Sequence, residues 1–273
     1  MNERQLAEYL ERIGHGWNVR PDLETLRSLH RAHLEAIPFE ALDVQLGRQP
    51  SLEPDAIFDK LVGQQRGGWC YEMNGLFGWA LEEIGFEVTR VSCGVMRHVA
   101  GEERMGTHLA LLVQIDGRPW LADVGFGSSL AEPIPLAHGE HPHAPFKVAL
   151  SQDEGYWRYS EFSGGEPFSF DFLADPADEA LLAAKCAWQA TSPESNFVQN
   201  FVAMKREGGD HLALRGRVLT RRGPAGPATQ TLLDADEFET VLRTVFGIEH
   251  SAARSLWPAI VARHDALFGA VAA

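Results

Sequence analysis

The chain is poor in cysteine, and this shortage excludes two common classes of structural site. Only Cys70, Cys93 and Cys186 occur among 273 residues. Because they are odd in number and far apart, they form neither a disulfide framework nor a zinc-binding pattern. We therefore expect a protein that works with reduced thiols and holds no structural zinc.

Basic residues and long apolar runs are also scarce. There are 24 Lys and Arg against 38 Asp and Glu, which gives a net charge of −14. Such a charge argues against nucleic acids and anionic membranes as partners, and no apolar run approaches the roughly 18 residues that a membrane span needs. The start, MNERQLAEYL, lacks the basic and then apolar pattern of a secretory signal. We expect a cytoplasmic protein with neither membrane nor nucleic-acid partners.

What the chain does contain is a change from helical to strand periodicity near Gly85. Apolar residues recur at helical spacing before this point, most clearly from Met73 to Ile84, and a third helix is expected from Pro54 to Leu61. Short segments rich in β-branched and aromatic residues follow, at 88–97, 107–115, 118–126, 156–162 and 167–173.

The rest of the chain mixes both patterns. We expect a helix at 176–188, strands at 201–206 and 211–220, two helices at 234–247 and 251–268, and a loop at 132–145. A chain of this length with this order of patterns favours two or three sub-domains around a shared core.

The stretch RGGWCYEMNGLF, residues 66–77, places Cys70 in or just before the first turn of a helix, directly after Gly67 and Gly68. A helix N-terminus favours a thiolate, and a protonated His108 in contact with the thiol would supply most of the effect, so we expect the pKa of Cys70 to lie well below the ordinary value of about 8.5. The glycines let the backbone approach a ligand closely, and we expect nearby amides to hold an oxyanion. Cys93 and Cys186 lie in amphipathic patterns typical of core residues.

A catalytic thiol needs a base, and the base needs an orienting group. His108 and Asp123 stand in apolar strand patterns where such side chains are costly to bury. Asp116-Gly117 between these strands is a strong hairpin signal. A two-residue turn pairs Ala110 with Asp123, so His108 and Asp123 are diagonal neighbours on one face. An odd loop length would put them on opposite faces, and a four-residue loop would separate them.

Other motifs are weaker. We interpret Gly125-Phe126-Gly127 as a turn that allows close backbone approach, because it lacks the third glycine of a nucleotide loop. His138, His141 and His143 fall in a proline-rich segment, where a solvated surface cluster is favoured over a metal site. The sequence therefore predicts no metal ligands.

Five motifs together resemble those of the arylamine N-acetyltransferases. They are IPFEALDV (37–44), RGGWCYEMN (66–74), THLALLV (107–113), LADVGFGS (121–128) and SPESNF (192–197), in the family's order. The resemblance implies an α+β fold with a helical bundle (1–85), a central antiparallel β-barrel (86–190) and a C-terminal α/β lid (191–273), around a papain-like or transglutaminase-like Cys-His-Asp core. Ala41 departs from the family, which usually has Asn after PFE.

The resemblance also implies roles for individual residues. Cys70 is the acetyl-accepting nucleophile, His108 its base and Asp123 the orienting carboxylate. Phe39, Val95 and Phe126 line the acceptor pocket, whereas Thr107, Gly127 and Phe197 lie near coenzyme A. Acetyl-CoA is then a co-substrate, with no permanently bound cofactor, and the protein is a monomer or homodimer.

The implied reaction is a ping-pong transfer of acetyl from acetyl-CoA through Cys70 to the nitrogen of an arylamine, arylhydrazine or N-hydroxyarylamine. Three alternatives remain open at this point. An amide synthase or a thiol hydrolase could use the same triad, and a binding module could retain the triad without catalysis.

Overall fold

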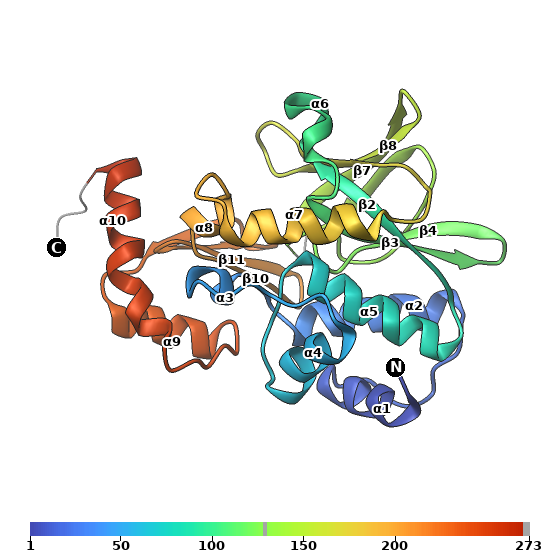
Figure 1. Cartoon of the computed structure of the whole chain (residues 1–273), viewed down its shortest axis with the longest axis horizontal. Coiled ribbons are helices and arrows are strands. Elements are labelled where there is room, and N and C mark those ends of the chain that lie inside the picture. The colour runs from blue at the N-terminus through green and yellow to red at the C-terminus, as the bar shows by residue number, and fades with distance from the viewer. Residues whose placement is uncertain (128–129, 270–273) are drawn as a thin grey trace.

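Helices form the N-terminal layer of the computed structural model, which describes residues 1–127 and 130–269 (Figure 1). Leu6, Tyr9 and Leu10 make the buried face of the first of them, as their spacing predicts. The layer contains α1 (Glu3–Arg12), α2 (Leu23–Ala36), α3 (Leu42–Gln45), α4 (Pro54–Phe58), the π-helical turn η1 (Asp59–Gly63) and α5 (Cys70–Ile84).

The central part of the chain is an antiparallel sheet of eight strands, which curls into a nearly closed barrel (Figure 1). Inward side chains from most of these strands, such as Val91, Leu112 and Phe170, meet in one apolar cluster, so the sheet wraps around them. In the order of the sheet, the strands are β5 (Ile134–Pro135), β4 (Arg118–Ala122), β3 (His108–Ile115), β2 (Glu87–Val95), β9 (Phe168–Phe172), β8 (Tyr156–Phe162), β7 (Phe146–Asp153) and β6 (Gly139–His143).

Strand β3 is the link between the barrel and the helices. Ala110 and Leu112 point into the barrel cluster, whereas Leu109 and Leu111 belong to the cluster that includes the buried side of α5. Because side chains alternate along a strand, β3 is buried on both faces. The helix that starts at Cys70 is thereby held against the strand that starts at His108.

A second antiparallel sheet completes the fold, in the order β1 (Phe39–Glu40), β10 (Val202–Glu207), β11 (Asp210–Arg215), β12 (Val218–Arg222) and β13 (Ala228–Thr231). Strand β1 comes from the N-terminal segment, so the sheet joins distant parts of the chain. Helices α9 (Ala235–Thr244) and α10 (Trp257–Phe268) form an apolar cluster with this sheet. Helix α7 (Glu179–Thr191) crosses the middle of the molecule between the two sheets, followed by α8 (Asn196–Gln199) (Figure 1).

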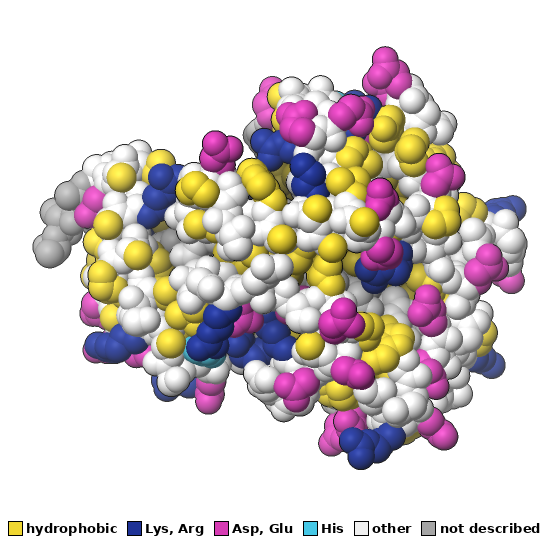
Figure 2. All heavy atoms as spheres, viewed as in Figure 1, with side chains coloured by type: hydrophobic (Ala, Val, Ile, Leu, Met, Phe, Trp, Pro, Cys, Tyr) yellow, Lys and Arg dark blue, Asp and Glu magenta, His cyan; other side chains and the backbone are white. Residues whose placement is uncertain are grey.

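Short helices complete the list of elements. They are α6 (Arg97–Ala100), η2 (Glu102–Arg104) and η3 (Ala253–Leu256). Among the described residues, no helix is long and apolar enough to cross a membrane. Acidic side chains are scattered over the face seen in Figure 2 rather than gathered in one patch.

Three expectations about secondary structure are wrong. The segment 132–145 contains β5 and β6, and Pro142 is tolerated in β6 because this strand lies at the edge of the sheet. The single strand expected at 211–220 is two strands, since Gly216 turns the chain with a φ of 58°. The third helix changes to a π-helical turn at Asp59.

Candidate active site

The hairpin of β3 and β4 brings His108 and Asp123 together. Ile115 pairs with Arg118 across the turn, and both turn residues have positive φ, 50° for Asp116 and 72° for Gly117. The expected register is therefore confirmed. His108 Nε2 lies 2.7 Å from Asp123 Oδ2, and both side chains are buried. With Nε2 engaged by the carboxylate, Nδ1 is the ring atom left to exchange a proton with another group.

Cys70 is the first residue of α5 and lies beside the end of this hairpin. A Cβ added to Gly125 would stand 2.7 Å from the Cα of Cys70, so only glycine lets the chain after Asp123 pass this closely. Cys70 and His108 line the same cavity, although the Cys70 residue is only 4% exposed. The structure thus places the thiol, the imidazole and the carboxylate in one region from three separate segments.

Asn74, which the sequence reasoning missed, ties these segments together. Its Nδ2 donates to Asp123 Oδ1 and to the carbonyl oxygen of Leu109, both at 2.7 Å, and its Oδ1 accepts from the amide of Val124 at 3.0 Å. Asn74 is four residues after Cys70, so both lie on one face of α5. A polar side chain at this spacing from the thiol, on the same face of the helix, was the available signal.

We expect Asn74→Ala to lower both stability and activity. The change leaves Asp123 Oδ1 with one donor fewer and the buried amide of Val124 without its acceptor, which costs about 3 kcal/mol in the free energy of unfolding. Urea unfolding and kcat/KM for acetyl transfer measure the two effects. The exposed Asn18→Ala is the matched control, and equal behaviour of the two variants would contradict the assignment.

The turn before Cys70 packs against Pro38 and β1. A Cβ on Gly67 would lie 2.2 Å from the carbonyl oxygen of Pro38, and the amide of Gly68 donates to that same oxygen at 3.2 Å. The amide of Trp69 donates to the Glu72 carboxylate at 3.2 Å. The expectation that amides of this turn hold an oxyanion is therefore wrong for Gly68 and Trp69. Gly67 is needed for the close approach of Pro38 and β1, whereas Gly68 leaves room for the Glu72 side chain.

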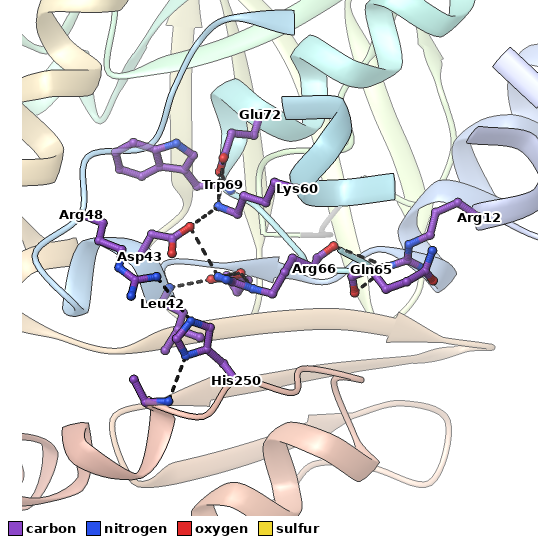
Figure 3. A network of polar contacts seen from close by, with 12 residues as sticks. Arg12, Leu42, Asp43, Arg48, Lys60, Gln65, Arg66, Trp69, Glu72 and His250 are labelled. Atoms are coloured by element: carbon purple, nitrogen blue, oxygen red, sulfur yellow. Dashed lines mark hydrogen bonds and ion pairs between the residues drawn. The ribbon is translucent and has the colours of Figure 1, made fainter. Parts of the chain in front are cut away.

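A network of buried charges lies beside this turn (Figure 3). Arg66 contacts Glu40 at 2.6 Å and Asp43 at 3.5 Å, whereas Lys60 contacts Asp43 at 2.7 Å and Glu72 at 2.9 Å. Glu40 also accepts from the first amide of α3, that of Leu42, at 2.6 Å. This carboxylate caps α3, where Ala41 at the N-cap position has no side-chain hydrogen bond.

Burial dominates the electrostatics of the thiol. It raises the pKa of Cys70, and the nearby Asp123 carboxylate adds to the increase, whereas the backbone amides of Leu109 and Tyr71 oppose it. The expected low pKa is therefore wrong, because desolvation outweighs the hydrogen bonds from these two amides. A buried thiol of this kind loses its proton to a neighbouring base rather than to solvent.

The pKa of the Asp123 carboxyl group shifts in the opposite direction. Burial by itself raises the pKa of Asp123, but the His108 ring and the donors Asn74 and Gly125 outweigh burial, and the net effect lowers the pKa. Asp123 is therefore ionised at neutral pH, with a partner for each of its oxygens.

A cavity of about 760 Å³ opens on this group. All six residues expected near substrates line it: Phe39, Val95, Thr107, Phe126, Gly127 and Phe197. The Phe126 ring lies 5.1 Å from the His108 ring and stacks on Phe168 at 5.0 Å. An aromatic wall therefore runs from the imidazole to Phe168, which the sequence reasoning also missed.

Other cavity residues come from distant strands. His211 on β11 donates through Nε2 to the carbonyl oxygen of Gly127 at 2.7 Å, which fixes the backbone there.

Cys93 and Cys186 are both buried in apolar clusters. The ring nitrogen Nδ1 of His143 accepts from the amide of Ala131 at 3.2 Å. Within residues 1–127 and 130–269, no cluster of three potential metal-ligand side chains is placed to hold an ion.

Known proteins resemble this chain in both sequence and fold. A family model described as N-acetyltransferase matches residues 22–254. Arylamine N-acetyltransferase 2 of Mus musculus is 32% identical over 93% of this chain and 96% of the relative. The arylamine N-acetyltransferase of Mycolicibacterium smegmatis is 38% identical over 78% of this chain and 81% of that protein.

Solved structures agree with the sequence comparison. The Mycobacterium marinum arylamine N-acetyltransferase in complex with CoA has a TM-score of 0.86 to this structure, at 31% identity, over 93% of this chain and 98% of that one. The chain therefore belongs to the arylamine N-acetyltransferase family.

Proposed function

We propose that the protein transfers an acetyl group from acetyl-CoA, through a thioester on Cys70, to the nitrogen of an arylamine, arylhydrazine or N-hydroxyarylamine. The observation that carries this is the buried 2.7 Å contact of His108 with Asp123, beside a thiol that shares its cavity. Family membership supplies the acyl donor and the acceptor class.

In the first half-reaction the Cys70 sulfur attacks the carbonyl carbon of acetyl-CoA while its proton passes to His108 Nδ1. The pKa of the buried thiol is raised, so this transfer accompanies the attack rather than preceding it. Asp123 supports the positive charge that forms on the imidazole. The backbone amides of Leu109 and Tyr71, which lower the pKa of the thiol, are donors placed beside the reacting sulfur. The CoA thiolate leaves with the proton that His108 returns.

In the second half-reaction the acceptor nitrogen attacks acetyl-Cys70 while His108 removes its proton, and the Cys70 thiol is restored. The near-complete burial of Cys70 and His108 keeps water from the thioester, which would otherwise hydrolyse. Phe39, Val95 and Phe126 form an apolar surface for the flat ring of the acceptor.

We assign Thr107, Gly127 and Phe197 to the coenzyme A side of the cavity. The Thr107 hydroxyl donates to the Arg104 carbonyl oxygen at 2.6 Å and accepts from Val95 at 3.1 Å, so one oxygen lone pair remains for a ligand. The Gly127 carbonyl is held by His211. The ring centroids of Phe197 and Phe39 lie 6.1 Å apart, and Phe197 offers apolar surface.

The fold supports a papain-like or transglutaminase-like core, in which a helix start carries the nucleophile and adjacent antiparallel strands carry the base and the carboxylate. We propose three sub-domains: a helical bundle at residues 1–85, a β-barrel at residues 86–190 and an α/β lid at residues 191–273. Strand β1 pairs with β10, so the bundle and the lid share one sheet. Residues 202–222 of the proposed lid supply one wall of the cavity.

Initial-rate kinetics with acetyl-CoA and a panel of arylamines and hydrazines test the proposal. Ping-pong transfer gives parallel double-reciprocal lines as the acceptor is varied, with a rate that depends on the acceptor. Acetyl-CoA hydrolysis that no acceptor accelerates would instead identify a hydrolase. Acetylation of Cys70 without transfer to any amine of the panel would favour an amide synthase.

A further inference from the structure

Five charged side chains lie beside the turn that leads into Cys70, three of them buried and two, Asp43 and Lys60, half-buried, and their negative charges outnumber their positive charges. Glu40, Asp43 and Glu72 carry negative charge, whereas Lys60 and Arg66 are the cations that contact them (Figure 3). Arg66 is engaged by Glu40 through both Nε and Nη2. Lys60 is therefore the cation that compensates Glu72.

Lys60 reaches Glu72 through both carboxylate oxygens. Its Nζ lies 2.9 Å from Oε1 and 3.0 Å from Oε2, and 2.7 Å from Asp43 Oδ2. The Lys60 side chain is 12% exposed and that of Glu72 only 2%. A pair this deeply buried is costly to form, and removing one partner is costlier than replacing both by neutral groups.

The Glu72 carboxylate in turn touches the backbone on which Cys70 depends. Its Oε2 accepts from the amide of Trp69 at 3.2 Å. A Cβ on Gly68 would lie 2.9 Å from the same oxygen, so the carboxylate fills the space beside that residue. Both residues before Cys70 are thus held by one side chain, while Gly125 packs against Cys70 itself.

We propose that Lys60 and Glu72 are positioning residues for Cys70: Lys60 holds the Glu72 carboxylate against Gly68 and Trp69, which fixes the sulfur relative to His108. The inference rests on the proposed role of Cys70 as nucleophile. Neither side chain lines the cavity, so both act through the backbone rather than by touching substrate.

The titration of Glu72 agrees with this role. Burial raises the pKa of Glu72 to about 7, with Lys60 opposing the increase and Glu40 adding to it. Glu72 is therefore partly protonated at neutral pH even beside Lys60, and loss of the Lys60 charge raises the pKa further, so that the protonated form predominates. A protonated carboxyl group is a weaker acceptor for the Trp69 amide, and its own O–H needs an acceptor. The hydrogen bond that holds the turn is therefore weakened.

Three variants separate charge from hydrogen bonding. Lys60→Gln leaves Glu72 uncompensated, and we expect the acetylation rate of Cys70 at saturating acetyl-CoA to fall about tenfold with KM unchanged. Glu72→Gln keeps an oxygen for Trp69, and the Lys60–Asp43 pair remains. In the double variant, the amide introduced at position 60 can donate to Asp43 and accept from the amide introduced at position 72. We therefore expect the double variant to recover to within about threefold of the wild-type rate.

The control is another ion pair, in which the carboxylate is fully buried and the guanidinium is 20% exposed. Arg158→Gln removes a cation that contacts the fully buried Asp171 at 2.7 Å in the barrel, so it costs stability without touching the Cys70 turn. Single-turnover acetylation is followed by rapid quench and intact mass, well below each unfolding midpoint. The proposal requires that Cys70 is acetylated slowly in Lys60→Gln, that the double variant recovers most of the rate, and that Arg158→Gln is acetylated at about the wild-type rate.

Each other result overturns the inference. Lys60→Gln at the wild-type rate removes the positioning role, and a double variant as slow as Lys60→Gln removes the charge coupling. Equal slowing by Arg158→Gln shows a general effect of lost stability. If wild-type protein itself forms no acetyl-Cys70, the proposed function fails, and that result is distinct from all of these.

Discussion

Cys70→Ser is expected to abolish acetyl transfer, with a fall in kcat/KM of about 10³-fold or more. A serine hydroxyl is a far weaker nucleophile than a thiol whose proton passes to His108, and neither of the other two thiols lines the cavity. Wild-type protein incubated with acetyl-CoA alone should gain the mass of one acetyl group, whereas the variant should gain none.

Peptide mapping locates the acetyl group. We expect it on Cys70, because Cys93 and Cys186 are buried in apolar clusters and do not line the cavity. Cys93→Ala and Cys186→Ala are the matched controls and should keep one acetyl group per chain. Acetyl on either of these cysteines in the wild-type protein would refute the assignment of the nucleophile.

Parts of the site that depend on neighbours in sequence could be predicted. The Asp116-Gly117 turn sets the hairpin register, and the register alone puts His108 and Asp123 on one face. The start of α5 follows from Gly67 and Gly68 and the apolar spacing after them. In each case the interaction spans no more than one hairpin or one helix.

Contacts between distant segments could not be predicted in this way. Asn74 reaches Asp123 across 49 residues, and an amphipathic pattern does not say which segment a helix face meets. The cavity wall from β10 and β11, with Met204 and His211, depends on the pairing of β10 with β1. The strand sequences VAMKRE and DHLALR do not indicate which strands they pair with.

The pKa of Cys70 shows that the protonation state of a thiol cannot be predicted until its burial is known. The helix N-terminus and the neighbouring imidazole were both visible as sequence features, whereas the depth of burial was not. Burial raises the pKa of the thiol, and for this reason the mechanism we propose has proton transfer to His108 accompany the attack. The role of His108 therefore depends on which ring nitrogen carries the proton.

Asp123→Asn is the variant that tests this dependence most directly, and we expect it to lower the rate of Cys70 acetylation by about 10⁴-fold while the fold is kept. In the wild-type protein His108 Nε2–H donates to Asp123 Oδ2, so Nδ1 has a free lone pair for the Cys70 proton. In the variant, the oxygen of the introduced amide keeps the donors Asn74 and Gly125, and its NH₂ group donates to His108 Nε2. The ring must then carry its proton on Nδ1 and can no longer accept one from the thiol.

The stability of the variant follows from the pKa of Asp123. Because that pKa is lowered in the folded protein, the carboxylate adds stability above its unfolded value of about 3.9, and this stability is lost as pH falls through the folded pKa. Asp123→Asn should therefore be less stable than wild type at neutral pH, with the difference shrinking below about pH 4. Thermal unfolding of both proteins, followed by circular dichroism at neutral pH and below about pH 4, measures this difference in stability.

The exposed Asp116→Asn, the same chemical change at the opposite end of the hairpin, is the matched control and should acetylate at the wild-type rate. Near-normal acetylation by a folded Asp123→Asn variant would show that His108 does not need the carboxylate to select its tautomer. Slow acetylation by both variants would place the effect in the hairpin rather than in the His108–Asp123 contact. Slow acetylation by Asp123→Asn alone ties the reaction to the proton on Nε2.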